Sequence, residues 1–190
     1  PDQDGPIDLS VLVPVFNEVD NVEPLFQELD AALRPSGRRY ELIFADDGST
    51  DGTAARLEAI QARDPEHVRV AFLWTNRGQT AALSAALDLA RGEVLVPIDG
   101  DRQNDPADIP KLLATLDEGY DVVSGWRKDR RDALLNRKIP SKIANMLVAR
   151  LSGIPLHDYG CTLKAYRRRV LAGVRLYGEM HRFIPIFAAW

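Results

Sequence analysis

The segment Val94–Pro106 reads VLVPIDGDRQNDP, and it joins an apolar run to a polar cluster and then to the start of a helix. The apolar run is rich in β-branched residues, as is typical of a strand that is covered on both faces. The polar cluster contains Asp99 and Asp101, whose like charges repel each other unless a cation neutralises them. The segment therefore predicts a buried strand that ends in a polar, ligand-facing loop.

The same unit recurs along the first 126 residues. Helical patterns cover about 20–33, 53–62 and 80–90, and a further one begins near Pro106. Strands that alternate with helices at this spacing indicate an α/β fold with a mostly parallel, Rossmann-like sheet, flanked by helices. The apolar runs predicted to be strands are Leu9–Val15, Tyr40–Ala45, Val68–Trp74, Val94–Ile98 and Asp121–Ser124.

The alternation breaks after Gly125, where the charge of the chain also changes sign. Residues 1–126 contain 10 Lys and Arg against 24 Asp and Glu, whereas residues 127–190 contain 14 against 4. We expect a helical pattern over 133–152, then a loop and a short basic segment, with no clear domain boundary. The basic third indicates an anionic partner such as a phosphate, nucleic acid or membrane surface. The alternative is a solvated basic face that balances the acidic body.

Polar residues follow each predicted strand. The carboxyl ends of parallel strands meet at one edge of a sheet, and open α/β sheets bind their ligands there. These clusters therefore predict a nucleotide-sized pocket at that edge. The clusters are Pro14–Glu18, Asp46–Gly52, Asn76–Gln79, Asp99–Gln103 and Gly125–Arg127.

Asp99 and Asp101 are the candidate metal ligands. Side chains at i and i+2 point the same way at the end of a strand, so both carboxylates can face one ion. Mg²⁺ and Mn²⁺ prefer oxygen ligands, and Gln103 can supply a third oxygen. Gly100 would let a ligand approach the backbone. The alternative is an ordinary turn, because Asp-Gly and Asn-Asp-Pro are turn formers.

Asp46, Asp47 and Glu18 are the candidate nucleotide-facing carboxylates. Acidic residues at such strand ends accept hydrogen bonds from a ribose hydroxyl or a base N–H. The alternative for Asp46 and Asp47 is a turn with a helix N-cap, and the alternative for Glu18 is a capping residue.

In their order along the chain, these motifs resemble those of inverting family 2 glycosyltransferases with the GT-A fold. The matching motifs are Pro14–Glu18 (PVFNE), Asp46–Thr53 (DDGSTDGT), Asn76–Gln79 (NRGQ) and Asp99–Pro106 (DGDRQNDP). Later segments resemble the polyprenyl-phosphate branch, which includes dolichol-phosphate mannose synthases and bacterial undecaprenyl-phosphate sugar transferases. Those segments are Gly125–Arg127, Arg137–Ser141, Asp158–Cys161 and Gly178–Phe183. Each motif alone is a weak signal, but the ordered set spans nearly the whole chain and is specific.

The resemblance implies a role for each matching residue. Asp99, Asp101 and Asp158 would be catalytic, with Asp158 near the transferred sugar. The nucleotide sugar would contact Pro14, Phe16, Glu18, Asp46, Asp47, Gln79, Asp99 and Arg182. The metal would be held by Asp99, Asp101 and Gln103, and the acceptor phosphate by Arg127, Arg137 and Ser141. The chain departs from the family pattern at Gly100 and Arg102, where many relatives have Ala and Leu. Arg102 adds a positive charge beside the metal ligands.

The resemblance also implies the reaction and its setting. A glycosyl group would pass, with inversion, from a UDP- or GDP-sugar to a dolichyl or undecaprenyl phosphate, with Mg²⁺ or Mn²⁺ as cofactor. The single catalytic domain, 1–190, would combine a nucleotide-sugar part (1–126) with an acceptor- and membrane-facing part (127–190). It would work at the cytoplasmic face of an anionic membrane. Membrane helices that many relatives carry after this domain would be absent from this chain. Nucleic acid is not an expected partner, because no aromatic residues interleave with Arg167–Arg169.

Three other readings compete with this one. A family 2 enzyme could use a saccharide hydroxyl as acceptor. A non-enzymatic receiver-like signalling module would account for Asp46 and Asp47 after a strand, but not for Asp99–Gln103 or the basic extension. A sugar-1-phosphate nucleotidyltransferase would have a glycine-rich basic loop after the first strand, where this chain has Pro14–Glu18.

Overall fold

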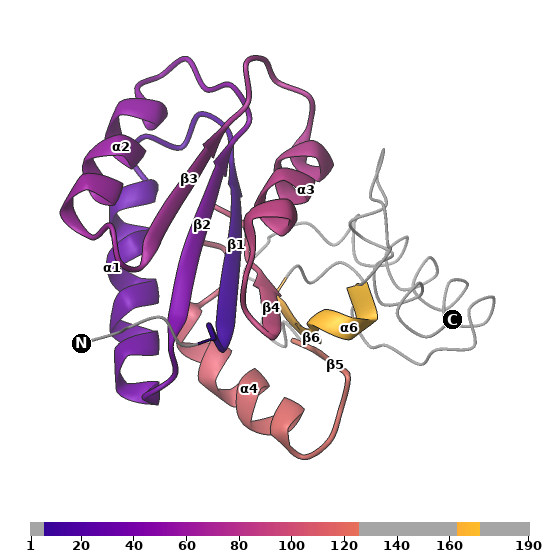
Figure 1. Ribbon diagram of the computed structural model, residues 1–190. Coiled ribbons are helices and arrows are strands. Elements are labelled where there is room, and N and C mark those ends of the chain that lie inside the picture. The colour runs from indigo at the N-terminus through magenta and orange to yellow at the C-terminus, as the bar shows by residue number, and fades with distance from the viewer. Residues whose placement is uncertain (1–5, 126–162, 172–190) are drawn as a thin grey trace, which may run out of the picture.

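A six-stranded sheet with helices on both faces forms the fold (Figure 1). The computed structural model describes residues 6–125 and 163–171. The strands are β1 (Leu9–Val15), β2 (Tyr40–Asp46), β3 (Val68–Phe72), β4 (Val94–Pro97), β5 (Val122–Ser124) and β6 (Lys164–Arg167). The α-helices are α1 (Val22–Leu33), α2 (Thr53–Arg63), α3 (Gln79–Leu89), α4 (Ile109–Asp117) and α6 (Arg168–Leu171). Two 3₁₀ turns, η1 (Arg34–Ser36) and η2 (Pro106–Asp108), complete the elements.

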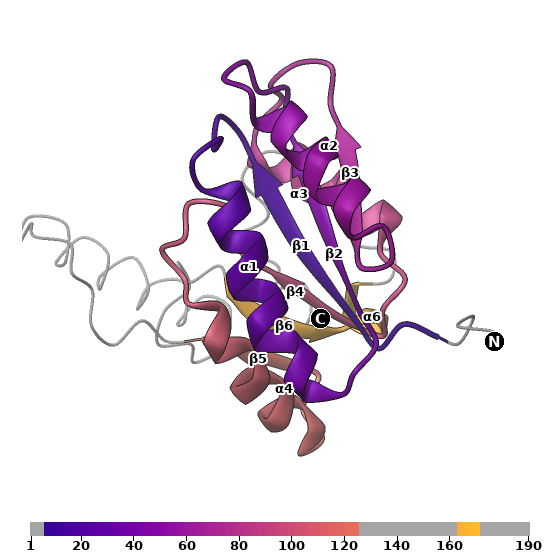
Figure 2. The same cartoon turned by 90° about the vertical axis from the view of Figure 1, so that its left-hand side faces the viewer.

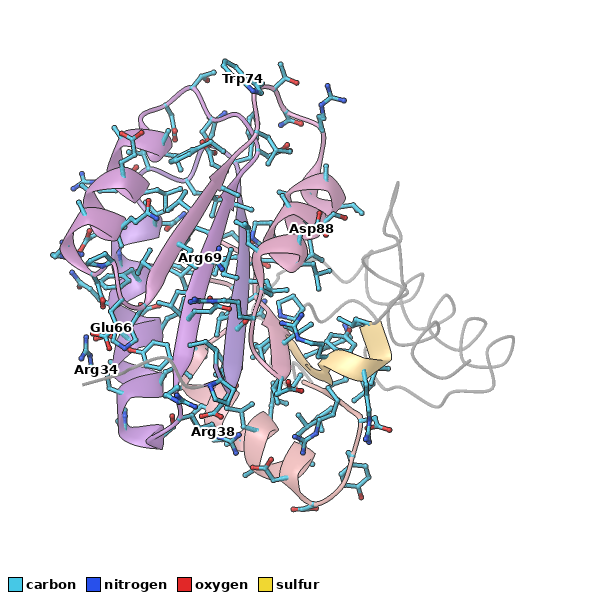
Figure 3. The ribbon with its side chains drawn as sticks, viewed as in Figure 1. Arg34, Arg38, Glu66, Arg69, Trp74 and Asp88 are labelled. Atoms are coloured by element: carbon cyan, nitrogen blue, oxygen red, sulfur yellow. The ribbon has the colours of Figure 1, made fainter. Side chains whose placement is uncertain are left out.

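The strand order is β3-β2-β1-β4-β6-β5, and β1 to β4 are parallel. This confirms the prediction of a mostly parallel α/β sheet. The central strand β1 is buried along its whole length, which explains why its sequence is apolar without alternation. The strand predicted over Val68–Trp74 ends at Phe72, and Trp74 is fully exposed in the loop beyond it (Figure 3).

Strand β6 was not predicted from the sequence, which indicated only a short basic segment there. This strand lies between β4 and β5 and is antiparallel to both. Four residues are too few to show a strand period, and the charge of Lys164 and Arg167 hides the burial of Ala165 and Tyr166. The pairing depends on a contact between distant parts of the chain, so local sequence could not reveal it.

The helices divide the core into two layers (Figure 2). One layer lies between the sheet and α1, α2 and α4, and it includes Leu25, Leu57 and Leu113. The other lies between the sheet and α3, where Leu83 and Ala86 pack on Leu12. Within the part of the chain that the structure describes, no helix is long and apolar enough to cross a membrane.

A buried carboxylate stabilises the sheet at the end opposite the polar loops. Glu41 of β2 is fully buried, and its Oε1 accepts hydrogen bonds from the Ser10 hydroxyl at 2.6 Å and the Arg91 backbone N–H at 2.7 Å. Its Oε2 accepts from Nε of Arg91 at 2.9 Å. Arg69 of β3, which is labelled in Figure 3, forms an ion pair with the same carboxylate. Burial by itself raises the pKa of Glu41, but the hydrogen bonds and charge from Ser10 and Arg91 outweigh it and hold this pKa below its usual range.

We expect Glu41→Gln to lower the free energy of unfolding by about 1–3 kcal/mol near pH 7, because Gln cannot match the charge-assisted bonds to Arg91. A depressed carboxyl pKa contributes stability that is present above the unfolded-state value and lost as pH falls through the folded-state value. The difference in the free energy of unfolding between wild type and variant should therefore become smaller below about pH 4.5. Urea titrations across this pH range measure this free energy, and Glu58→Gln, at an exposed position, is the control. A constant difference at every pH would contradict this account.

Candidate functional site

A cleft of about 340 Å³ lies at the carboxyl end of the sheet, where the clusters after β1, β2, β3 and β4 converge. Its size falls within the range of about 300–1,000 Å³ that is typical of small-molecule sites. This confirms the predicted convergence of four clusters. The fifth begins at Gly125 and continues outside the described residues. The cleft is lined by Pro14, Val15, Phe16, Glu18, Asp47, Asn76, Gly78, Gln79, Ala82, Asp99, Gly100 and Asp101.

The loop after β1 is bound to the loop after β2 by interlocking hydrogen bonds. Asn17 donates its backbone N–H to Ser49 Oγ at 2.8 Å, and its Oδ1 accepts from the Thr50 N–H at 2.9 Å. One residue on, the Glu18 N–H donates to Thr53 Oγ1 at 2.9 Å. Asn17 has a φ of 55°, a left-handed conformation that Asn tolerates better than most residues. This wall of the cleft, which holds Phe16 and Glu18, is thus preorganised.

Glu18 lines the cleft while its carboxylate is held locally. Its Oε2 accepts a hydrogen bond from Asn21 Nδ2 at 2.5 Å, and its backbone carbonyl accepts from the backbone N–H groups of Asn21 and Val22, where α1 begins. The N-cap of α1 is Asn21 rather than Glu18, and the Glu18 carboxylate binds the side chain of Asn21, so the structure does not support the capping alternative. Phe16 has 42% of its surface exposed, and a ring so exposed at the mouth of a cleft can stack on a planar ligand.

The neighbours Asp46 and Asp47 have different surroundings. Asp46 is buried, and its Oδ1 accepts hydrogen bonds from the backbone and hydroxyl of Ser49; it is not among the residues that line the cleft. Asp47 does line the cleft, and its carboxylate accepts the N–H groups of Arg77 at 2.8 Å and Gly78 at 2.7 Å. Asp47 therefore ties the loop after β3 to the loop after β2. Contacts of either carboxylate with a nucleotide stay predictions.

Asp99 and Asp101 both line the cleft, at the end of β4. Gln79, the first residue of α3, donates from Nε2 to Asp99 Oδ1 at 2.6 Å. Asp101 Oδ1 accepts the Gln103 backbone N–H at 3.0 Å, so the turn predicted as the alternative is present together with the carboxylate pair. A Cβ on Gly100 would lie 2.7 Å from Val15 Cγ1, so this glycine lets the loop pack directly on the end of β1.

This donor set fits a hard divalent cation. Two carboxylates face one cleft, and a Mg²⁺ ion commonly takes one or two carboxylates together with phosphate oxygens and waters. No cluster of three or more His, Cys, Asp and Glu side chains occurs within residues 6–125 and 163–171, so these residues do not form an all-protein cage. Gln103 is exposed and is not among the lining residues, so its role as a third ligand stays a prediction.

Several predicted site residues lie outside the described residues, and their roles stay predictions. They are Arg127, Arg137, Ser141, Asp158 and Arg182. Asn17, Ser49 and Thr50 hold the loops of the site together, a role that was not predicted from the sequence. The only local signal for them was their position within the polar clusters.

Comparison with known proteins identifies relatives over most of the chain. Residues 10–175 match the family model Glycosyl transferase family 2. The chain is 47% identical to dodecaprenyl-phosphate galacturonate synthase of Rhizobium johnstonii, over 96% of this chain and 54% of that protein. It is 42% identical to undecaprenyl-phosphate 4-deoxy-4-formamido-L-arabinose transferase of Pseudomonas paraeruginosa, with the same shares covered. The chain thus spans about half the length of these curated relatives.

Solved structures share the fold at lower identity. Glucosyl-3-phosphoglycerate synthase of Mycobacterium tuberculosis, solved with Mn²⁺, UDP and glucosyl-3-phosphoglycerate, matches with a TM-score of 0.67 at 24% identity, over 88% of this chain and 59% of that one. A mannosyltransferase of Pyrobaculum calidifontis, solved with GDP-Man and Mn²⁺, matches with a TM-score of 0.63 at 22% identity, over 90% and 49%. These neighbours confirm the GT-A fold.

We expect Asp47→Ala to loosen the loop after β3, because the N–H groups of Arg77 and Gly78 lose their acceptors. Amide hydrogen exchange at these two residues should become at least about tenfold faster, while β1 and β2 keep their protection. The control is Asp88→Ala, an exposed position near the far end of α3 (Figure 3). Unchanged exchange at Arg77 and Gly78 would show that other contacts hold the loop.

Proposed function

The chain belongs to glycosyl transferase family 2, and on that premise we propose that it transfers a glycosyl group from a nucleotide diphosphate sugar to the phosphate of a polyprenyl lipid, with inversion at the anomeric carbon. The observation that carries the proposal is the cleft in which Asp99 and Asp101 lie beside Phe16 and Glu18. Two carboxylates that can bind a cation line the same cleft as an aromatic ring and a further carboxylate, and a nucleotide diphosphate would use each of these features.

The relatives support the choice of substrates. The two curated relatives are named for transfer involving dodecaprenyl and undecaprenyl phosphate, and each matches 96% of this chain. The two solved structures contain UDP or GDP-Man together with Mn²⁺. We extend to this chain the shared chemistry: a UDP- or GDP-sugar donor, a polyprenyl phosphate acceptor and a divalent cation, Mg²⁺ or Mn²⁺.

In this proposal the residues of the cleft bind and orient the donor. Pro14, Phe16 and Glu18 flank the base and ribose, while Asp46 and Asp47 contribute to this wall directly or through the loops that they hold. Asp99 and Asp101, with Gln103, would hold the divalent cation, and Gln79 fixes the orientation of Asp99. When bound, the cation supplies charge neutralisation for the diphosphate leaving group.

The chemical step requires little proton transfer. A phosphate oxygen of the acceptor is already ionised at neutral pH, so it can attack the anomeric carbon as the bond from that carbon to the diphosphate breaks. We assign Asp158 to orienting the sugar rather than to removing a proton. Arg127, Arg137 and Ser141 would bind the acceptor phosphate, because guanidinium groups match phosphate geometry, and Arg182 would approach the diphosphate.

We place this reaction at the cytoplasmic face of a membrane. Residues 127–142 carry seven basic side chains against two acidic ones. Each basic residue close to an anionic bilayer contributes about 1 kcal/mol of attraction, so this stretch would bring the acceptor side of the domain to the lipid. The division into a nucleotide-sugar part and an acceptor part follows the same change in charge near residue 126.

A donor screen tests the proposal. The full-length protein is incubated with polyprenyl phosphate and each common nucleotide sugar, with and without EDTA. We expect a lipid-linked sugar from one donor, loss of product with EDTA and recovery with added Mn²⁺. Turnover that persists in EDTA, or no lipid-linked product from any donor, would overturn the proposal. If the sugar is transferred only to a saccharide hydroxyl, the proposed acceptor is wrong and a saccharide takes the place of polyprenyl phosphate.

Asp99→Asn and Asp101→Asn should each lower the rate of product formation by at least about 100-fold, because each removes a charge from the cation site. Asp108→Asn, an exposed position further along the same segment, is the matched control and should keep full activity. Circular dichroism should show an unchanged fold for all three variants. Near-normal activity of either cleft variant would rule out its metal role.

A further inference from the structure

Arg102 places a positive charge next to the residues that would bind a cation. It directly follows Asp101, and its φ of 59° is one of two positive values for non-glycine residues in the part of the chain that the structure describes. A guanidinium at this position could occupy the carboxylates of Asp99 and Asp101 itself, in competition with a divalent ion. Whether the Arg102 side chain points toward or away from these carboxylates therefore affects how strongly they can bind a cation.

The guanidinium of Arg102 is held on helix α1, away from the two carboxylates. Its Nη2 donates to Oε1 of Glu28, and its Nε donates to Oε2 of Glu28 at 3.4 Å. The left-handed backbone at Arg102 also lets the Gln103 N–H return to Asp101 Oδ1 at 3.0 Å. The two neighbouring side chains therefore diverge: Asp101 lines the cleft, and Arg102 extends to Glu28.

We propose that Glu28 is a positioning residue that withholds Arg102 from the cation site. This inference rests on the proposed function, because it takes Asp99 and Asp101 as metal ligands. With Glu28 in place, Asp99 and Asp101 line the cleft and the Arg102 guanidinium is paired on α1. Without it, Arg102 can fold back on Asp101 as an internal counter-ion, and a divalent ion must displace it.

The exposure of the Arg102–Glu28 pair limits how much the loss of Glu28 can change Mn²⁺ binding. The side chains of Arg102 and Glu28 are 38% and 40% exposed, so water screens their attraction and the pair is a weak one. We expect loss of Glu28 to weaken Mn²⁺ binding by about three- to tenfold rather than to abolish it. The effect should shrink in about 0.5 M salt, because the Debye length there is only a few ångströms.

The test measures Mn²⁺ binding directly. Free Mn²⁺ is followed by electron paramagnetic resonance during titration of the full-length protein, with Mn²⁺ alone and with Mn²⁺ plus UDP or GDP. The variants are Glu28→Gln, Arg102→Gln and the double variant. We expect Glu28→Gln to raise the Kd for Mn²⁺ about three- to tenfold, and Arg102→Gln to leave it unchanged or lower it. The double variant should behave like Arg102→Gln.

The double variant separates this proposal from simple charge removal. Glu28→Gln also removes a negative charge from the neighbourhood of the cation, and that loss would weaken binding equally whether or not Arg102 is present. The proposal requires the effect only when Arg102 is present. Glu23→Gln is the matched control, because it breaks another ion pair of α1, to Arg63 at 2.7 Å, and should leave the Kd unchanged.

The outcomes distinguish the two proposals. If wild type and Asp99→Asn bind Mn²⁺ equally, with and without nucleotide, the metal site of the proposed function is wrong. A second outcome is that Asp99→Asn loses Mn²⁺ binding, while Glu28→Gln changes the Kd equally, or not at all, whether residue 102 is Arg or Gln. That outcome would overturn only the role of Glu28. Thermal unfolding of every variant checks that a change in Kd does not come from loss of the fold.

Discussion

The parallel alignment of β1, β2, β3 and β4 is the constraint on which the rest of the structure depends. It brings four polar loops to one edge of the sheet, although those loops are separated by whole helices in the sequence. Once there, the loops are joined in series by hydrogen bonds. The loop after β1 binds the loop after β2 through Asn17, Asp47 binds the loop after β3, and Gln79 binds Asp99 after β4. The cleft is therefore preorganised by its own walls, which reduces the entropy that a ligand must overcome to bind.

The carboxylates at this edge divide into two kinds. Asp46 and Asp51 accept hydrogen bonds from neighbouring backbone and hydroxyl groups and hold the loop after β2 in place. Asp99 and Asp101 line the cleft, where Asp99 accepts a hydrogen bond from Gln79 and Asp101 accepts one from the Gln103 backbone. Asp47 has both characters, because it lines the cleft while its two oxygens accept backbone amides. A concentration of negative charge at one edge thus does not mean that every carboxylate meets a ligand, and several act through the backbone that they hold.

Pairing between distant residues also explains how the motif around Asp99 and Asp101 can contain Arg102, which departs from the family pattern. A positive side chain beside two candidate metal ligands conflicts with cation binding if it is considered alone. In the fold, α1 crosses close enough for Glu28 to pair with Arg102, and the conflict is removed by a residue 74 positions away in the sequence. The opposite end of the sheet uses a similar arrangement, in which Arg69 and Arg91 balance the buried charge of Glu41. At both ends of the sheet, these charges are balanced by residues that are distant in the sequence.

The sequence by itself determined the strands β1 to β5, the helices between them and the clusters that meet at the cleft, because period and composition are local properties. It also determined the family, because ordered motifs survive where overall identity falls. Only the tertiary structure decided the place of β6, whose four residues become a strand by pairing with β4 and β5. Only the tertiary structure shows that Asp47 lines the cleft whereas Asp46 binds Ser49, and that Arg102 pairs with Glu28. These outcomes depend on contacts between distant segments, and the free energy of such contacts is not encoded in any single stretch of the chain.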